Sequence, residues 1–201
     1  ESVAGSSSLI QYGYDLLGRL LTVTKDGSLV EEYRYDGNGN RTYQMNAYLG
    51  IAGRTFTHSV ADHTLTAGPV TYEFDDDDNL AARLENGETT RYSYSAAGEL
   101  LRVTRPDGTV ISHVHDPLGR RIARQVNGTT VEKYLWSGQT TLLAVYDGND
   151  NLRQRFQYAD DRMPFAMTMG GTTYYLVYDQ VGSLRLVVDS GGTIVKRIDY
   201  D

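Results

Sequence analysis

Cysteine is absent from this chain, and proline and phenylalanine are scarce, with four residues of each among 201. Without cysteine there are no disulfide bonds and no thiol chemistry, so the fold does not depend on the redox state of its compartment. No apolar run approaches the roughly 20 residues of a membrane-spanning helix, and no signal-peptide pattern opens the sequence. We therefore expect no membrane span, and we expect any export signal to have been removed or to lie elsewhere.

The sequence has fewer positive than negative charges, and it lacks the periodicity of a helix. Asp and Glu outnumber Lys and Arg by 26 to 19, which gives a formal net charge of −7. This balance argues against nucleic acid or an anionic membrane as a partner. No segment shows a sustained apolar spacing of 3.6 residues, so we expect no helix.

What the sequence does contain is a repeat, which first occurs as Tyr12-Gly13-Tyr14-Asp15-Leu16-Leu17-Gly18-Arg19-Leu20. Two aromatic residues alternate with other residues and precede an Asp-x-x-Gly segment. The second aromatic position recurs at steps of 21, 39, 20, 21, 21, 22, 20 and 22 residues. It is occupied by Tyr14, Tyr35, Phe74, Tyr94, His115, Trp136, Tyr158, Tyr178 and Tyr200. A fixed period in this range predicts a repeat array, with one degraded repeat inside the long step.

Two series of glycines divide each repeat into short segments. The Asp-x-x-Gly segment predicts one turn, and Asp-Gly or Asn-Gly pairs such as Asp26-Gly27, Asn86-Gly87, Asp107-Gly108 and Asp147-Gly148 predict tight hairpin turns. Runs of five to seven residues rich in Thr, Val, Tyr and Leu lie between them and have the composition of strands. The predicted fold class is therefore all-β, an antiparallel β-hairpin repeat array of roughly eighteen strands that forms one long curled sheet.

With its Asp-Gly partner turn, the Tyr-x-Tyr-Asp-x-x-Gly-Arg-Leu pattern resembles the YD repeat, or Rhs repeat, of bacterial polymorphic toxins, insecticidal toxin-complex subunits and teneurins. The resemblance covers residues 9–201. It implies a sheet that spirals into a shell around a C-terminal toxic domain, in a protein that is secreted or at the bacterial cell surface. The self-cleaving aspartate segment that closes such shells has no match here, so its catalytic residues are not carried over.

The repeat pattern also sets the expected domain organisation. Residues 1–8 are expected to be a linker or a cloning remnant, and residues 9–201 the YD-repeat array. Between residues 42 and 70 the pattern loosens, and we expect an irregular hairpin there in which Thr55-Phe56-Thr57 stands in for the missing repeat. Tyr outnumbers Phe by 16 to 4, which fits a thin sheet whose rings are half buried and whose hydroxyl groups meet water.

Two kinds of residue invite a metal-site hypothesis. His113 and His115 share one face of their strand, but they stand at the repeated aromatic positions and no third histidine accompanies them, so we interpret them as substituted ring positions. His58 and His63 lie in the irregular segment and give a weaker signal. The run Asp75-Asp76-Asp77-Asp78 lacks the Gly and closing Glu of an EF-hand loop. We read this run, Asp36–Asn40 and Asp147–Asn151 as turn chemistry, and we predict no metal and no cofactor.

No catalytic constellation stands out. Gly-x-Ser-x-Gly and His-Glu-x-x-His are both absent, and paired carboxylates occur only at repeated turn positions. We therefore predict a structural shell wall that is not an enzyme. Its predicted partners are the rest of its own shell, an enclosed polypeptide and, through exposed sheet edges, further copies of itself. The alternative is an adhesion or carbohydrate-binding module that uses the tyrosine face, but we favour cross-strand pairing of the rings as the explanation of that spacing.

Overall fold

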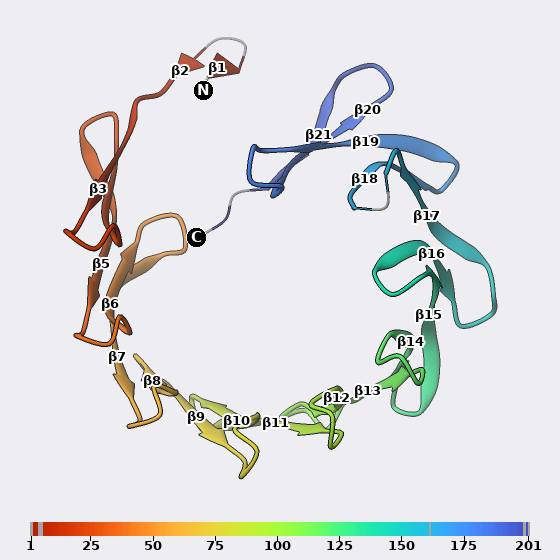
Figure 1. The fold of residues 1–201 in the computed structure, drawn as a ribbon, viewed down its shortest axis with the longest axis horizontal. Helices are drawn as coiled ribbons and strands as arrows, with labels where there is room; N and C mark the ends of the chain where they lie inside the picture. Colours follow the sequence, from red (N-terminus) through yellow and green to blue (C-terminus); the bar gives the residue numbers. More distant parts are fainter. Residues whose placement is uncertain (1, 4–5, 161, 199, 201) are drawn as a thin grey trace. The chain divides into compact units, whose positions relative to one another are not determined.

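The computed structural model describes residues 2–3, 6–160, 162–198 and 200 of the chain, and within them it contains strands and turns but no helix. The chain divides into two compact units, Glu1–Arg91 and Tyr92–Asp201. Figure 1 shows the first in red to yellow and the second in green to blue. The two units are described separately below.

The first unit is an antiparallel meander in which each strand pairs with its neighbours in the sequence. Its strands are β3 (Ile10–Tyr14), β4 (Leu20–Lys25), β5 (Ser28–Tyr35), β6 (Arg41–Asn46), β7 (Ile51–His58), β8 (Thr64–Ala67), β9 (Val70–Phe74), β10 (Leu80–Glu85) and β11 (Glu88–Tyr94), the last of which continues past the unit boundary. Ahead of them, within the segment expected to be a linker, β1 (Ser2–Val3) pairs with β2 (Ser6–Ser7).

The second unit has the same organisation. Its strands are β12 (Leu100–Thr104), β13 (Val110–His115), β14 (Arg121–Val126), β15 (Thr129–Ser137), β16 (Thr141–Asp147), β17 (Leu152–Tyr158), β18 (Pro164–Met169), β19 (Thr172–Tyr178), β20 (Leu184–Asp189) and β21 (Ile194–Arg197). The all-β antiparallel prediction is confirmed, with 19 strands from β3 to β21 against the roughly eighteen expected.

A five-residue turn of constant geometry closes ten of the hairpins in the described residues. In the first of them the Asp15 N–H donates to the Arg19 carbonyl, and the Gly18 N–H donates back to the Asp15 carbonyl. Gly18 has a φ of 77°, the left-handed region that favours glycine. This is a type I turn followed by one left-handed residue, a common three-residue hairpin connection. The Asp15 carboxylate also accepts hydrogen bonds from the Leu17 and Arg19 N–H groups, both at 2.9 Å.

The Asp-Gly and Asn-Gly pairs divide into two turn types. Asp26-Gly27, Asn86-Gly87 and Asn127-Gly128 have positive φ at both residues, as the predicted two-residue hairpin turns require. Asp107-Gly108 and Asp147-Gly148 instead belong to five-residue turns that begin at Arg105 and Asp147. For these two pairs the tight-turn prediction was wrong, because the dipeptide alone does not fix its place in the turn.

A β-bulge recurs where the second aromatic residue of a repeat meets the strand after its turn. Tyr14 pairs with Leu20 while Gly13 pairs with Thr22, which leaves Leu21 as the extra residue of β4. The same shift places Tyr35 opposite Arg41 and Tyr178 opposite Leu184. A bulge disrupts the local ladder and increases its twist. The repeat therefore encodes a bulge as well as two turns.

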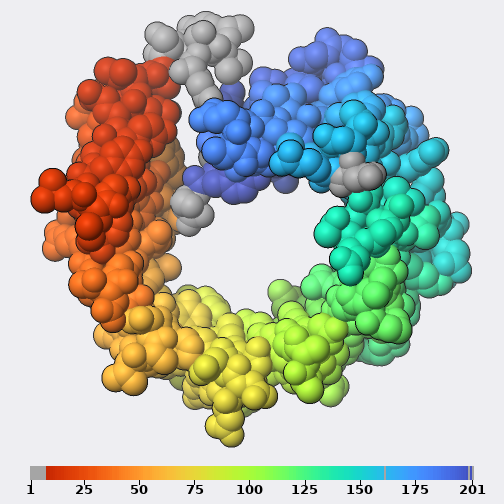
Figure 2. Space-filling model, viewed as in Figure 1, coloured from red at the N-terminus to blue at the C-terminus, as the bar shows by residue number. Residues whose placement is uncertain are grey.

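Most of the buried apolar positions carry Ala or Val. Ala82 is 1% exposed and Ala166 is 0% exposed, and valines such as Val23 and Val70 are buried with them. In Figure 2 the colour changes gradually across the surface of each unit, because a segment contacts mainly those just before and after it in the sequence. A sheet of this kind is stabilised by contacts between neighbouring repeats, as in other repeat proteins.

Candidate functional site

In several repeats the second aromatic residue is hydrogen-bonded to the backbone of the repeat before it. The Tyr35 hydroxyl donates to the Leu20 carbonyl at 2.9 Å, next to the bulge of β4. The same bond is made by Tyr158 to Leu142 at 2.9 Å, by Tyr178 to Pro164 at 2.8 Å, by Tyr200 to Leu184 at 3.0 Å and by the Trp136 indole to Arg121 at 2.8 Å.

These bonds correct one expectation from the sequence. The tyrosine hydroxyl groups at these positions were expected to meet water, but they donate to backbone carbonyls beside the bulges. A carbonyl group next to a disrupted ladder gains a partner in this way. Burial also raises the pKa of Tyr158 and Tyr178, which keeps both hydroxyl groups protonated as donors. The excess of Tyr over Phe therefore has a structural cause.

Arginine after the turn glycine joins neighbouring turns. The Arg19 guanidinium donates to the Asp15 carboxylate at 2.6 Å and to the Asp36 carbonyl of the next repeat at 3.1 Å. Arg120 likewise binds both the Asp116 carboxylate and the Gly138 carbonyl. Opposite charges held this close form charge-assisted bonds that are stronger than neutral ones. The Gly-Arg step of the repeat therefore connects one turn to the next along the edge of the sheet.

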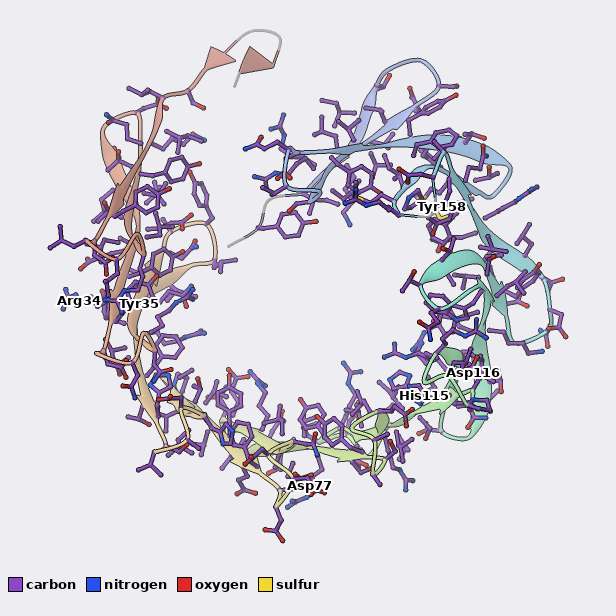
Figure 3. The ribbon with its side chains drawn as sticks, viewed as in Figure 1. Arg34, Tyr35, Asp77, His115, Asp116 and Tyr158 are labelled. Atoms are coloured by element: carbon purple, nitrogen blue, oxygen red, sulfur yellow. The ribbon has the colours of Figure 1, made fainter. Side chains whose placement is uncertain are left out.

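Arginine side chains also lie over tyrosine rings, on both faces of the sheet. Figure 3 shows Arg34 and Tyr35 pointing to opposite sides of β5. Arg34 lies 4.6 Å from the centre of the Tyr43 ring on one face, and Arg41 lies 4.7 Å from the Tyr33 ring on the other. At these positions of the first unit the tyrosine rings make cation–π contacts with arginine, where tyrosine-on-tyrosine pairing was expected from the spacing.

We call the side that carries the paired repeat aromatics the aromatic face of each unit. In the first unit this face is hollowed between β7 and β10 into a shallow depression of about 470 Å³ lined by Phe56, His63, Thr64, Ala67, Tyr72, Phe74 and Leu80. The His63 and Phe74 rings stack in it with their centroids 4.4 Å apart. A second depression of about 410 Å³ adjoins it and shares Phe56 and Thr64. These concave, ring-lined surfaces are candidate binding surfaces.

His113 and His115 lie together on the aromatic face of the second unit, with ring centroids 6.5 Å apart. The Nδ1 atoms of both rings are buried without a hydrogen-bond partner. Burial lowers the pKa of His113, and the nearby Arg121, His115 and Arg124 lower it further. Two rings surrounded by guanidinium groups form a poor environment for a cation.

The acidic segments act in turns. Asp75 accepts hydrogen bonds from the N–H groups of Asp77 and Asn79, and Asp77 lies at the tip of its turn (Figure 3). Asp78 has a φ of 63° and takes the position of the turn glycine. Asp36 and Asp147 accept hydrogen bonds from their own turns in the same way. Within the described residues, no group of three or more His, Asp or Glu side chains is placed to hold a metal ion.

The repeat missing from the sequence pattern is present in the structure. The Ser59 N–H donates to the His63 carbonyl, and the Ser59 hydroxyl accepts hydrogen bonds from the N–H groups of Ala61 and His63 at 3.1 Å. Asp62 takes the left-handed position with a φ of 63°. Phe56 and His58 therefore stand at the two aromatic positions of this repeat. A repeat pattern that accepts Ser in place of the turn Asp and Asp in place of the turn Gly matches this repeat.

Asn side chains and His63 continue the connection between turns through this repeat. Asn38 and Asn40 donate to the Asp62 carboxylate at 3.0 and 2.6 Å, and His63 Nε2 lies 3.8 Å from the Asp78 carboxylate. Together with the bond from Arg19 to the Asp36 carbonyl, these contacts join four successive turns of the first unit. The structure thus brings His63 and the acidic run together, although no pattern in the sequence connects them.

Asp116 provides a direct test of the turn geometry. Asp116→Ala removes the acceptor for the Leu118 and Arg120 N–H groups and the carboxylate that binds Arg120. We expect exchange of these two amide hydrogens to accelerate by roughly tenfold or more, because the turn opens locally. Hydrogen exchange followed by NMR measures this. Asp77→Ala, at an exposed turn position, is the control; equal effects of the two substitutions would contradict the role given to Asp116.

Acid should weaken the array through the same carboxylates. Hydrogen bonds from Arg19 hold the pKa of Asp15 below its usual value, and bonds from Arg120 and Asn151 do the same for Asp116 and Asp147. A lowered pKa in the folded state gives stability that is complete above the unfolded pKa, near 3.9, and is lost as the pH falls through the folded value. Urea unfolding at pH 7 and at decreasing pH below about 4 should show this loss; a constant midpoint would contradict it.

Comparison with known proteins gives a consistent family match. A family model described as Teneurin YD-shell matches residues 1–201. The tRNA nuclease WapA of Bacillus subtilis (strain 168) is 26% identical over 206 residues, which cover 94% of this chain and 8% of that protein. Teneurin-3 of Danio rerio is 26% identical over 194 residues, which cover 94% of this chain and 7% of that protein. This chain therefore spans less than a tenth of the length of these relatives.

Among solved structures, the crystal structure of TcdB2-TccC3 matches at 17% identity with a TM-score of 0.41, over 91% of this chain and 11% of that one. This similarity is too low to support an inference. Within the described residues, no helix has the length and apolarity to cross a bilayer.

Proposed function

Because this chain belongs to the Teneurin YD-shell family, we propose that it forms a stretch of shell wall that encloses or presents another polypeptide and performs no catalysis itself. As the family resemblance implies, we propose that the whole protein is secreted or at the bacterial cell surface. The enclosed polypeptide would be a toxin or effector that follows the wall in the sequence. The nuclease activity in the name of WapA is a property of that relative.

The observation that carries this proposal is the recurrence of one set of contacts. The tyrosine hydroxyl that binds the preceding repeat occurs in both units, at Tyr35 and again at Tyr158 and Tyr178. The arginine bridge between turns occurs in both units as well, at Arg19 and Arg120. A catalytic group is normally singular, whereas contacts repeated along a chain extend one surface. A wall is the function that such a surface serves.

Hydroxyl-radical footprinting of the full-length protein that contains this chain tests the proposal. We expect side chains of the aromatic face, such as Tyr72, Phe74 and Trp136, to be less reactive in the full-length protein than in the chain alone. Tyr43, which lies on the opposite face with Arg34, should react equally in both. If the aromatic face reacts equally in the two proteins, it encloses nothing and the proposal fails.

The hollow in the first unit favours a second candidate, a carbohydrate-binding module. Aromatic rings bordering a shallow depression, as Phe56, Tyr72 and Phe74 do, provide stacking surfaces for sugar rings. Titration of the chain with an oligosaccharide, followed by NMR, tests this candidate. Saturable shifts that are lost in Tyr72→Ala and kept in Tyr43→Ala would support it, and the absence of any shift would exclude that sugar.

We also propose that the isolated chain associates with copies of itself through strand edges. All four residues of β21 are exposed, including Ile194 at 39% and Val195 at 51%. Exposed strands with apolar side chains readily pair with other chains. Size-exclusion chromatography with light scattering should therefore show a mass that increases with concentration, and Val195→Lys should reduce this increase. A strictly monomeric species would contradict the prediction.

A further inference from the structure

Two departures from the repeat coincide in one place in the second unit. The aromatic positions of β13 carry His113 and His115, and the first residue of β14 is Arg121. At this position five repeats have leucine, namely Leu20, Leu80, Leu100, Leu142 and Leu184. The register places Arg121 opposite His115 and Arg124 opposite His113. Residues directly opposite each other on paired strands share a face and lie in contact range, so the four side chains form one cluster.

The two histidines present hydrogen-bond donors to solvent. Their Nδ1 atoms are buried without a partner, while their Nε2 atoms are not among the buried, unpartnered atoms of the described residues. A buried N–H without an acceptor is less tolerated than a buried lone pair without a donor. We therefore assign the lone pair to Nδ1 and the proton to Nε2 in both rings. The cluster thus displays two imidazole N–H groups.

The two arginines differ in their partners. Arg124 is neutralised by Glu132, which it contacts at 2.9 and 3.1 Å and which also accepts the Tyr134 hydroxyl at 2.6 Å. Arg121 is exposed, and within the described residues its guanidinium makes no hydrogen bond or ion pair. Its charge acts on His113, Glu132 and Tyr134, which places it close to all three. The Trp136 indole holds the Arg121 carbonyl at 2.8 Å and so fixes its backbone.

A repeat of the first unit shows what the two histidines change. Arg41 occupies the position of Arg121 in its own repeat, opposite Tyr35, as the register shows. Its guanidinium lies over the Tyr33 ring at 4.7 Å. In the second unit His113 replaces that tyrosine, so Arg121 has no such tyrosine ring below it. Histidine in place of both aromatic residues thus removes the cation–π contact. It leaves the Arg121 guanidinium and the two imidazole N–H groups as donors without acceptors among the described residues.

We propose that Arg121, His113 and His115 form a binding site for an oxyanion group, either a carboxylate or a phosphate. The guanidinium fork binds two oxygens of such a group at once, and the imidazole N–H groups add donors beside it. Glu132 does not compete, because Arg124 and Tyr134 occupy it. The unpaired charge of Arg121 opposes binding of a metal ion at the two histidines. This site does not depend on the proposed role as a shell wall.

Imidazole ¹H–¹⁵N NMR spectra of the whole chain test the proposal, with the four histidines assigned from single His→Gln variants. We expect saturable shifts of His113 and His115, and none of His58, on titration with inorganic phosphate or with a hexaglutamate peptide. Whichever probe binds at lower concentration identifies phosphate or peptide carboxylate as the preferred source. Arg121→Gln should weaken the binding by roughly tenfold or more, because it removes the charged fork.

Arg41→Gln is the matched control and should leave the affinity unchanged. Arg121 has an exposed side chain, so Arg121→Gln should keep the fold, and an unchanged circular dichroism spectrum verifies this. The double substitution of His113 and His115 by tyrosine restores the ordinary repeat and should abolish binding. Equal binding by the Arg121→Gln and unsubstituted chains would overturn the proposal. So would saturable Zn²⁺ binding that strengthens in Arg121→Gln, which would identify the histidines as metal ligands.

Discussion

Replacing Gly148 with alanine should destabilise the second unit by about 2–4 kcal/mol, the largest effect that we expect of any single methyl group in the chain. A Cβ atom at this position would clash with the Thr130 carbonyl oxygen and lie 3.0 Å from the Thr130 carbonyl carbon. Both are backbone atoms of β15, so no side chain can rotate away to relieve the clash. Either β15 or the turn that begins at Asp147 must move.

Gly37→Ala is the matched control, because Gly37 follows Asp36 as Gly148 follows Asp147 in a turn of the same geometry. A Cβ atom on Gly37 meets nothing within 4 Å, and neither glycine has a positive φ. Gly37→Ala should therefore be neutral or stabilise the chain by up to about 1 kcal/mol through the unfolded state.

Urea unfolding followed by circular dichroism compares the two variants. Fluorescence of Trp136, the only tryptophan, reports on the second unit separately. If Gly148→Ala leaves the unfolding midpoint reported by Trp136 fluorescence unchanged, then β15 and the turn that begins at Asp147 are not held close enough to exclude a side chain at residue 148.

Removing the hydroxyl groups that bind one repeat to the next should have the second-largest effect. Tyr158→Phe and Tyr178→Phe each leave a carbonyl beside a bulge without its donor, at Leu142 and Pro164. Each loss should cost about 1 kcal/mol, and the double variant about 2 kcal/mol. The rings stay in place, so packing is conserved and the difference measures the hydrogen bond.

Tyr14→Phe is the control for this series. Tyr14 stands at the same repeat position but is 59% exposed, and within the described residues its hydroxyl makes no hydrogen bond. Its substitution should change the unfolding free energy by less than about 0.5 kcal/mol. Urea unfolding curves of the four variants and the unsubstituted chain measure these differences in unfolding free energy. If Tyr158→Phe is as neutral as Tyr14→Phe, the hydroxyl groups contribute no stability and the tyrosine excess needs another cause.

The Asp-x-x-Gly turns were the part of the fold that the sequence determined best. Asp15 followed three residues later by Gly18 specifies a carboxylate acceptor and a left-handed position, and both are local properties of the chain. The alternation of Tyr12 and Tyr14 likewise indicated a shared strand face. Fold class and strand number followed from these local signals without any tertiary contact.

The features that the sequence did not determine depend on atoms of another strand. Gly148 looked like half of a tight turn, and only the position of Thr130 reveals why a side chain is excluded there. The acceptor of the Tyr35 hydroxyl lies 15 residues earlier, at a bulge that no local pattern announces. Ser59 and Asp62 reproduce the turn with other residue types, because a hydroxyl group replaces the carboxylate and Asp tolerates positive φ.

Within the described residues of each unit, strands pair with their neighbours in the sequence, and this has a consequence for how the unit is assembled and taken apart. A hairpin needs only the segment just made before it, so loop closure costs little entropy and each unit can grow in the order in which its residues emerge. In the part of each unit that the structure describes, no strand is threaded through another. Tension on the two ends of a unit is therefore expected to peel off one hairpin after another, in steps of a repeat's length, and release of tension to let them close again in the reverse order.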